Sequence, residues 1–191
     1  MSVLRSFKFR TAPWLWSFHK RSISTSATKI ISVFAVLAIW NGSEKGNDTL
    51  FRAELDALPI QETNDLAYNS SREGVSHKCG HDGHMTILCG LALQLASNKP
   101  SKGSIMLLFQ PAEETGQGAK SVLADKQFQS LNFDYAFALH NLPKRKKGTI
   151  YCKKGSFCAA STGLIIKLQG KTAHASQPHT GNNPAIATAQ M

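Results

Sequence analysis

Short apolar runs alternate with longer helical stretches from residue 30 onward. Apolar residues at 31–40 and 49–58 predict two strands. The turn-forming segment NGSEKGND between them predicts that the two strands form a hairpin. The segment HMTILCGLALQLAS (84–97) has the length and composition of a helix, and Asn98-Lys99-Pro100 is a stop signal after it.

Three further elements continue this alternation. The run SIMLLF (104–109) is continuously apolar, as in a strand that is covered on both faces. A second helix is predicted over 118–129, and YAFALH (135–140) predicts another buried strand. The order strand, helix, strand, helix, strand predicts an α/β fold, a three-layer domain with a mostly parallel sheet.

The pattern changes at residues 141–148 (NLPKRKKG), which have the composition of a loop. Beyond it, residues 149–153 and 162–168 alternate like strands of a half-exposed antiparallel sheet, and a helix is predicted from Asn183. We therefore expect one domain over 29–150 and a second, incomplete domain over 151–191 that ends within an element.

Composition and charge narrow the class of protein. With 42% hydrophobic residues the chain can bury a core, which excludes global disorder. The formal net charge of +10 favours nucleic-acid binding at first sight. However, the KRKK run at 144–147 has no aromatic residue within it and is interpreted as a solvated loop, so we expect no nucleic-acid partner.

The first 28 residues are rich in Arg, Ser and Thr and contain no acid. This composition is typical of a mitochondrial presequence, and a disordered N-terminus of a cytoplasmic protein is the alternative. The 4 cysteines contain no CxxC pair, which favours a reducing compartment. No apolar run approaches the roughly 20 residues of a membrane-spanning helix, so we expect no membrane span.

The motif CGHDGH (79–84) brings thiol, imidazole and carboxylate groups together at the start of a predicted helix. These donors suit zinc, cobalt or manganese, and the glycines let Cys79 and His81 converge. The alternative is that His81 and His84 are loop or core histidines and that Cys79 is a buried thiol.

Further polar residues follow the other predicted strands. Glu113 and Glu114 follow strand 104–109, and His140 closes strand 135–140. Ligands collect at the carboxyl ends of strands in open α/β sheets, where one carboxylate can bind a metal while its neighbour moves a proton. Asp56, near the end of another strand, could orient a ligating imidazole.

Each of these residues also has a simpler interpretation: an exposed acidic pair, a structural histidine, or an aspartate that starts a turn. All of them, however, are expected at strand ends on one side of one sheet. One bimetallic site explains this placement better than several independent coincidences.

Five strings carry a resemblance to a known family: FRAELDALPIQE, HKCGHDGHM, LLFQPAEETGQGA, FALHNLP and GKTAHASQPHTGNNPA. They resemble the metal-dependent amidohydrolases that include N-acyl-amino-acid amidohydrolases, hippurate hydrolase and plant indole-acetyl-amino-acid hydrolases. The resemblance runs from about residue 32 to residue 191, and the order of CGHDGH and QPAEE is specific. It implies a catalytic domain with two divalent metals and an inserted α/β lid domain that mediates homodimerisation.

The resemblance also implies roles for individual residues. Glu113 is similar to the general base that activates the attacking water, and His174 to the lid histidine that stabilises the oxyanion. The substrates implied are N-acyl-amino acids or amino-acid conjugates, hydrolysed to a carboxylic acid and a free amino acid. Four residues resemble the metal ligands: Cys79, His81, Glu114 and His140.

The chain also departs from the family pattern. Members supply one more ligating histidine from a segment that follows the lid, whereas residues 151–191 match only the beginning of the lid. We therefore expect a truncated member. The alternative to an active amidohydrolase is an inactive fragment that retains partial metal binding or associates through its lid.

Overall fold

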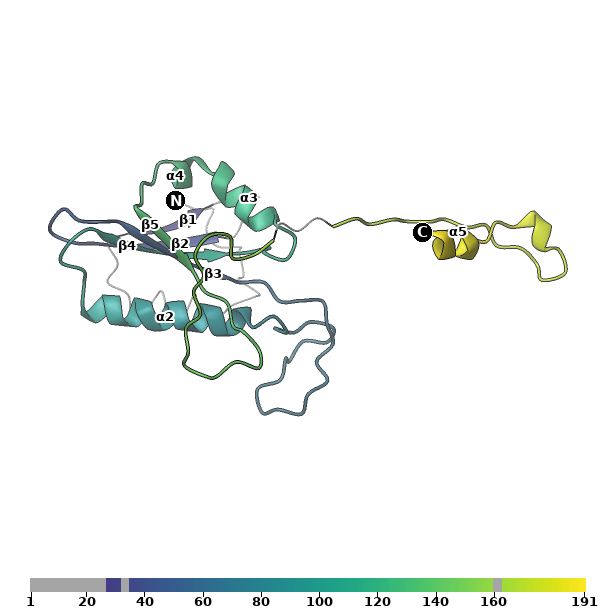
Figure 1. The fold of residues 1–191 in the computed structure, drawn as a ribbon, viewed down its shortest axis with the longest axis horizontal. Helices are drawn as coiled ribbons and strands as arrows, with labels where there is room; N and C mark the ends of the chain where they lie inside the picture. Colours follow the sequence, from purple (N-terminus) through teal and green to yellow (C-terminus); the bar gives the residue numbers. More distant parts are fainter. Residues whose placement is uncertain (1–26, 32–34, 160–162) are drawn as a thin grey trace, which may run out of the picture. The chain divides into compact units, whose positions relative to one another are not determined.

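The computed structural model describes residues 27–31, 35–159 and 163–191. The chain divides into two compact units, residues 1–144 and 145–191. The first unit contains a five-stranded sheet in the order β1-β2-β4-β3-β5 (Figure 1). Its strands are β1 (Ala27–Ile31), β2 (Ala35–Asn41), β3 (Thr49–Glu54), β4 (Ser104–Gln110) and β5 (Tyr135–Ala138).

The sheet is mixed. β4 and β5 each run parallel to β3, whereas β2 is antiparallel to both β1 and β4. The apolar run that the sequence predicted as one strand is divided between β1, which ends at Ile31, and β2, which begins at Ala35. The α/β class is confirmed, but only the β4-β3-β5 half of the sheet is parallel.

The predicted hairpin between β2 and β3 is wrong, because β4 lies between these two strands. The continuously apolar β4 takes this central place since both of its faces are buried. The turn-forming segment after β2 packs along the residues that precede β4 instead. Gly42 N donates to Gly103 O at 2.7 Å, and a Cβ added to Gly42 would lie 2.8 Å from that oxygen.

Helices cover both faces of the sheet, so the predicted three layers are confirmed (Figure 1). On one face lies α2 (His81–Ser97), which packs Met85 and Leu88 against Trp40 of β2. On the other face, α3 (Gln117–Ala124) and α4 (Lys126–Gln129) contribute Val122 and Phe128. The side chains of β2 alternate between the two cores, as expected for a strand covered on both faces.

The helix boundaries differ from the predicted ones at two places. α2 begins at His81 rather than residue 84, after Gly80 with its left-handed φ of 89°. The predicted helix 118–129 is divided at Asp125, whose backbone is extended and whose carboxylate accepts hydrogen bonds from Gln127 N and Phe128 N. This capping pattern starts a new helix instead of continuing the first.

β5 was predicted to be buried, and this is wrong. Tyr135 and Phe137 are 52% and 53% exposed. β5 is the edge strand, hydrogen-bonded only to β3 among the described strands. One of its apolar residues, Phe137, stacks on Phe51 of β3, with ring centroids 5.4 Å apart.

The second unit contains a 3-10 helix η1 (Pro178–Thr180) and the helix α5 (Ala185–Gln190), close to the predicted helix start at Asn183. Residues 149–153 and 163–168 do not form the predicted strands. Ile150, Leu164 and Ile165 in these segments are more than 80% exposed. Two short strands without a covered apolar face are marginal in water, which explains why alternation alone did not predict this region correctly.

Most of the predicted leader lies outside the described residues. Only Ala27 and Thr28 of residues 1–28 are described, and they open β1. Among the described residues, none of the helices combines the length and the apolar character needed to cross a membrane.

Candidate metal centre

The candidate residues of the first unit lie where three parallel strands end and α2 begins. Glu54 and Gln110 stand opposite each other at the ends of β3 and β4, and β5 runs in the same direction. Parallel strands bring their carboxyl ends to one edge, where α2 also presents its first residue, His81. Potential ligand atoms come within 4.8 Å of one another in three groups: Cys79, His81 and His140; His81, Glu113 and Glu114; and Glu54, His81 and His84.

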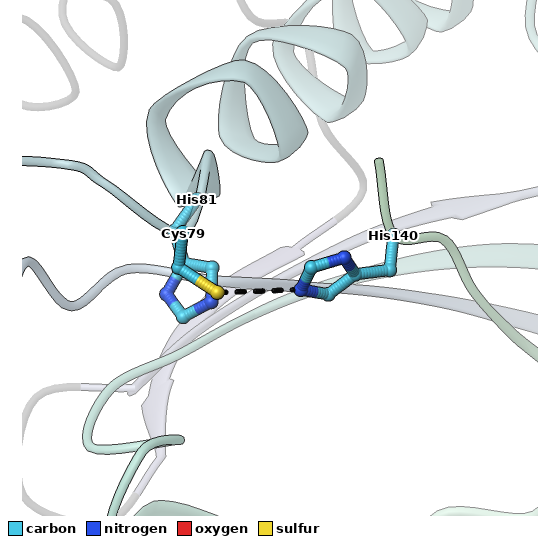
Figure 2. Close-up of side chains that lie close together, drawn as sticks. All are labelled: Cys79, His81 and His140. Carbon is cyan, nitrogen blue, oxygen red and sulfur yellow. Dashed lines mark hydrogen bonds between the residues drawn. The ribbon is translucent and has the colours of Figure 1, made fainter. Parts of the chain in front are cut away.

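Cys79, His81 and His140 form the first group (Figure 2). Cys79 Sγ lies 3.4 Å from His140 Nε2, and these residues are 61 positions apart in the sequence. His140 Nδ1 lies 2.9 Å from the carbonyl oxygen of Asn141, to which it can donate. With its proton on Nδ1, the His140 ring directs an Nε2 lone pair toward Cys79.

His81 is fully buried, and its two ring nitrogens have different surroundings. Nδ1 lies 2.9 Å from the backbone oxygen of Asp56 and 3.4 Å from Asp56 Oδ1. Donation from Nδ1 to Asp56 leaves a lone pair on Nε2. The sequence predicted that the Asp56 carboxylate orients an imidazole. The atom within hydrogen-bond distance of Nδ1 is instead the backbone oxygen of Asp56, and the orienting role of the carboxylate stays a prediction.

Nε2 of His81 is buried and has no hydrogen-bond partner in the structure. It faces two carboxylates, 3.8 Å from Glu114 Oε1 and 3.9 Å from Glu113 Oε2. A buried polar atom without a partner costs about 1–3 kcal/mol. A divalent cation would remove this cost by accepting the lone pair and by balancing the carboxylates, so the donor set fits a metal.

A tight turn after β4 presents Glu113 and Glu114. Ala112 has a positive φ of 49°, and Gly118 N donates to Ala112 O at 3.0 Å. Glu114 N donates to Asp56 Oδ2 at 3.1 Å, which ties the turn to the segment after β3. Because the two carboxylates are almost equally far from His81, distance does not distinguish a ligand from a proton acceptor.

This turn yields a stability prediction at Gly118. A Cβ at Gly118 would lie 1.5 Å from the carbonyl oxygen of Pro111, so Gly118→Ala must displace the backbone that presents the two carboxylates. We expect Gly118→Ala to lower the free energy of unfolding by about 1–3 kcal/mol in urea titrations.

Gly90, in the middle of α2, is the matched control for this substitution. A Cβ there meets nothing within 4 Å, so Gly90→Ala should raise the free energy of unfolding by about 0.4–1 kcal/mol. Equal effects of the two substitutions would contradict the close contact at Pro111.

The Cys79 thiol is surrounded by negative charge. Desolvation by burial, a hydrogen bond with Glu114, and the charges of Glu114, Glu113 and Glu54 raise the pKa of Cys79 to about 11. In the metal-free chain this thiol therefore keeps its proton at neutral pH. Ligation by a metal requires the thiolate, so binding must expel that proton.

Metal affinity should consequently depend on pH. The folded-state pKa of Cys79 lies far above neutral, so between about pH 7 and pH 9 each ion bound by the thiolate releases one proton, and the apparent affinity rises about tenfold per pH unit. Competition between the chain and a chromophoric chelator for Zn²⁺ measures this slope.

Two variants separate Cys79 from Cys89, a buried cysteine of α2. Cys79→Ser should flatten the slope, whereas Cys89→Ala should retain it. Burial also raises the pKa of Cys89 to about 11, but Cys89 belongs to none of the three groups. A slope in the unsubstituted chain that Cys79→Ser leaves unchanged would exclude the thiolate as the source of the proton.

A buried hydrogen-bond network behind the site was not predicted from the sequence. His84 Nδ1 lies 2.8 Å from Glu54 Oε2, and Asn141 N donates to His84 Nε2 at 3.0 Å. Two local signals mark its residues as candidates, although neither signal tells that the two side chains meet. Glu54 ends a strand two residues before Asp56, and His84 is the last residue of the CGHDGH motif.

His174 belongs to the second unit and is exposed. Its Nδ1 lies 2.7 Å from Ser176 Oγ. With Lys171 and Asn182 it lines a surface cavity of about 520 Å³. Its role in stabilising an oxyanion stays a prediction.

Most of the chain is similar to one known protein family. The model of peptidase family M20/M25/M40 matches residues 50–190. An N-acetyl-L-cysteine deacetylase of Bacillus subtilis (strain 168) is 43% identical over 160 residues, which is 83% of this chain and 37% of that protein. A hippurate hydrolase of Campylobacter jejuni is 41% identical over 151 residues, 78% of this chain and 39% of that protein.

Two solved structures are also similar to this chain. A Bacillus subtilis protein described as a dinuclear metal binding peptidase from the M20 family superposes with a TM-score of 0.53 at 39% identity, over 58% of this chain and 30% of that one. A protein of methicillin-resistant Staphylococcus aureus classed as an aminohydrolase reaches a TM-score of 0.65 at 27% identity, over 96% of this chain and 48% of that one. The chain thus spans less than half the length of these relatives.

Proposed function

Because the chain belongs to the M20/M25/M40 peptidase family, we propose that the whole protein is a metal-dependent amidohydrolase that cleaves N-acyl-amino acids or amino-acid conjugates. The products are a carboxylic acid and a free amino acid. The single observation that carries this proposal is the buried, unpartnered Nε2 of His81, which faces Glu113 and Glu114. Relatives named as an N-acetyl-L-cysteine deacetylase and a hippurate hydrolase support the substrate class.

The proposed ligands combine a thiolate, a carboxylate and two imidazoles: Cys79, Glu114, His81 and His140. This donor set suits two divalent ions of zinc, manganese or cobalt, with the thiolate favouring zinc. The dinuclear M20 peptidase of Bacillus subtilis supports the number of ions. When bound, such ions polarise the amide carbonyl and make water more acidic.

In this proposal Glu113 moves the protons. Its carboxylate takes a proton from the attacking water and delivers that proton to the nitrogen of the leaving amine. Its side chain is 37% exposed, so water and substrate can reach it, while His81 beside it is fully buried. Asp56 holds the His81 ring through Nδ1, which keeps the Nε2 lone pair directed at the two carboxylates.

We propose two roles for the second unit. We assign residues 151–191 to a lid domain that pairs two copies of the whole protein, and His174 to stabilisation of the oxyanion that forms during hydrolysis. The string GKTAH supports this role, as does the position of His174 on a cavity beside Lys171.

We also propose a mitochondrial location for the protein, because residues 1–28 contain no acidic residue.

An assay of amino-acid release tests the proposed function. The purified chain, loaded with Zn²⁺ or Mn²⁺, is incubated with acetyl- and benzoyl-amino acids, and free amino acid is quantified beside the metal content of the protein. The proposal expects release that depends on metal and is lost in Glu113→Gln. Stoichiometric metal without release would favour the alternative, a fragment that binds metal but has no activity of its own.

A further inference from the structure

His140 is an exposed residue beyond the end of an exposed edge strand, yet its ring is held against Cys79. A ligand on such a segment needs support, because a loose side chain would lose affinity for any metal. The support lies in the next residue. The carbonyl oxygen of Asn141 is 2.9 Å from His140 Nδ1, and its N–H donates to His84 Nε2 at 3.0 Å.

His84 is itself fixed by a buried carboxylate. It is 2% exposed, and its Nδ1 lies 2.8 Å from Oε2 of Glu54, which is also 2% exposed. A carboxylate only accepts, so the ring carries its proton on Nδ1 and presents Nε2 as the acceptor that the N–H of Asn141 requires. Both ring nitrogens of His84 are thereby used, which makes the group of Glu54, His81 and His84 a hydrogen-bond network rather than a third metal site.

Gly80, which precedes α2, lies close to the side chain of Asn141. A Cβ at Gly80 would lie 2.8 Å from Asn141 Oδ1, and the φ of Gly80 is 89°, a conformation that favours glycine. The side-chain amide of Asn141 also reaches His84 Nε2, with Oδ1 placed 2.9 Å away. Because this nitrogen accepts, the contact is a hydrogen bond when the amide is turned so that its NH₂ group donates. Asn141 is thus held between the residue that precedes α2 and the ring of His84 in the first turn of the helix.

We propose that the buried Glu54–His84 pair is a positioning device that holds Asn141, and through Asn141 holds the ring of His140 in the orientation required of a metal ligand. Arg52 Nη1 donates to Glu54 Oε1 at 2.5 Å, which fixes the far end of the network on β3. The inference rests on the proposed function in one respect only, namely that His140 is a ligand. Neither Glu54 nor His84 touches substrate in it.

Two substitutions of His84 separate its two hydrogen bonds. In His84→Gln, the side-chain oxygen lies near the place of Nε2 and can accept from Asn141 N–H. In His84→Asn, the side-chain nitrogen lies near the place of Nδ1 and can donate to Glu54, but the contact with Asn141 is lost. Ala92→Gly, on the same buried face of α2 and 3% exposed, is the control for a general loss of stability.

Amide hydrogen exchange of the metal-free chain of 191 residues tests the network directly. Because Asn141 is exposed, protection of its N–H reports the bond to His84. His84→Asn should speed exchange at Asn141 about tenfold, the value of one hydrogen bond, whereas His84→Gln and Ala92→Gly should not. The amide of Leu55, which donates to Gln110 O at 2.8 Å, serves as an internal reference.

Titration with Co²⁺ tests the consequence for the ligand. His84→Asn should weaken Co²⁺ binding about 10–100-fold, with most of the affinity restored in His84→Gln. Unprotected Asn141 in the unsubstituted chain, or equal Co²⁺ affinity in all variants, would overturn the inference. If exchange and Co²⁺ affinity respond as expected but no amide is hydrolysed, the proposed function fails while the positioning role stands.

Discussion

Replacing His81 with alanine should abolish stoichiometric binding of divalent metal by this chain. His81 belongs to all three groups of potential ligands in the described part of the chain, and its Nε2 is buried without a hydrogen-bond partner. Removal of a group that only hydrogen-bonds to a ligand typically weakens metal binding about 10–100-fold. We expect His81→Ala to weaken it more than that. Metal content after dialysis against Zn²⁺, measured by elemental analysis, gives the answer.

His77→Ala is the matched control for this experiment. His77 lies in the same segment but belongs to none of the three groups. Burial is the main reason that its pKa is lowered, partly offset by Asp82. We expect this variant to bind metal normally, and circular dichroism should show both variants folded. Equal metal content in His81→Ala and the unsubstituted chain would rule out the proposed centre.

Replacing Glu113 with glutamine should lower the rate of amide hydrolysis by about 10²–10⁴-fold, the usual contribution of a general base. The substitution keeps the shape of the side chain but removes its ability to accept a proton. Metal content should stay the same, because Glu113 is assigned to proton transfer and not to ligation. The measurement is kcat for release of free amino acid from metal-loaded enzyme.

Glu114→Gln provides the contrast, since the two carboxylates lie 3.8 and 3.9 Å from the same nitrogen. We expect this variant to lose metal together with activity. If Glu113→Gln loses metal and Glu114→Gln keeps it, the two roles are exchanged. If neither variant changes kcat, proton transfer by this pair is wrong.

Local signals in the sequence were sufficient to predict the elements that carry the candidate site. The continuous apolar run before QPAEE correctly predicted a buried strand, β4, and the run after CGHDGH predicted a helix. Chemistry at strand ends then predicted that residues as distant as Cys79 and His140 would meet, and their side chains lie 3.4 Å apart. The number of residues between a side chain and the nearest glycine or strand end can be read from one short segment, without knowing what packs against it.

Features that depend on long-range neighbours could not be predicted in this way. The turn signal NGSEKGND is genuine, but it does not tell which strand becomes the neighbour of β2, and β4 takes that place. The apolar residues of β5 do not tell that the whole strand is exposed. The contact of Glu54 and His84 joins a strand end to a helix across 30 positions, where neither residue type signals the other.

The absorption spectrum of the chain with Co²⁺ shows whether the metal centre includes Cys79. A thiolate ligand gives cobalt an intense charge-transfer band in the near ultraviolet, which oxygen and nitrogen ligands do not. We expect this band in the unsubstituted chain and in Cys89→Ala, and its loss in Cys79→Ser. Absence of the band from the unsubstituted chain, or its persistence in Cys79→Ser, would show that Cys79 is not a ligand.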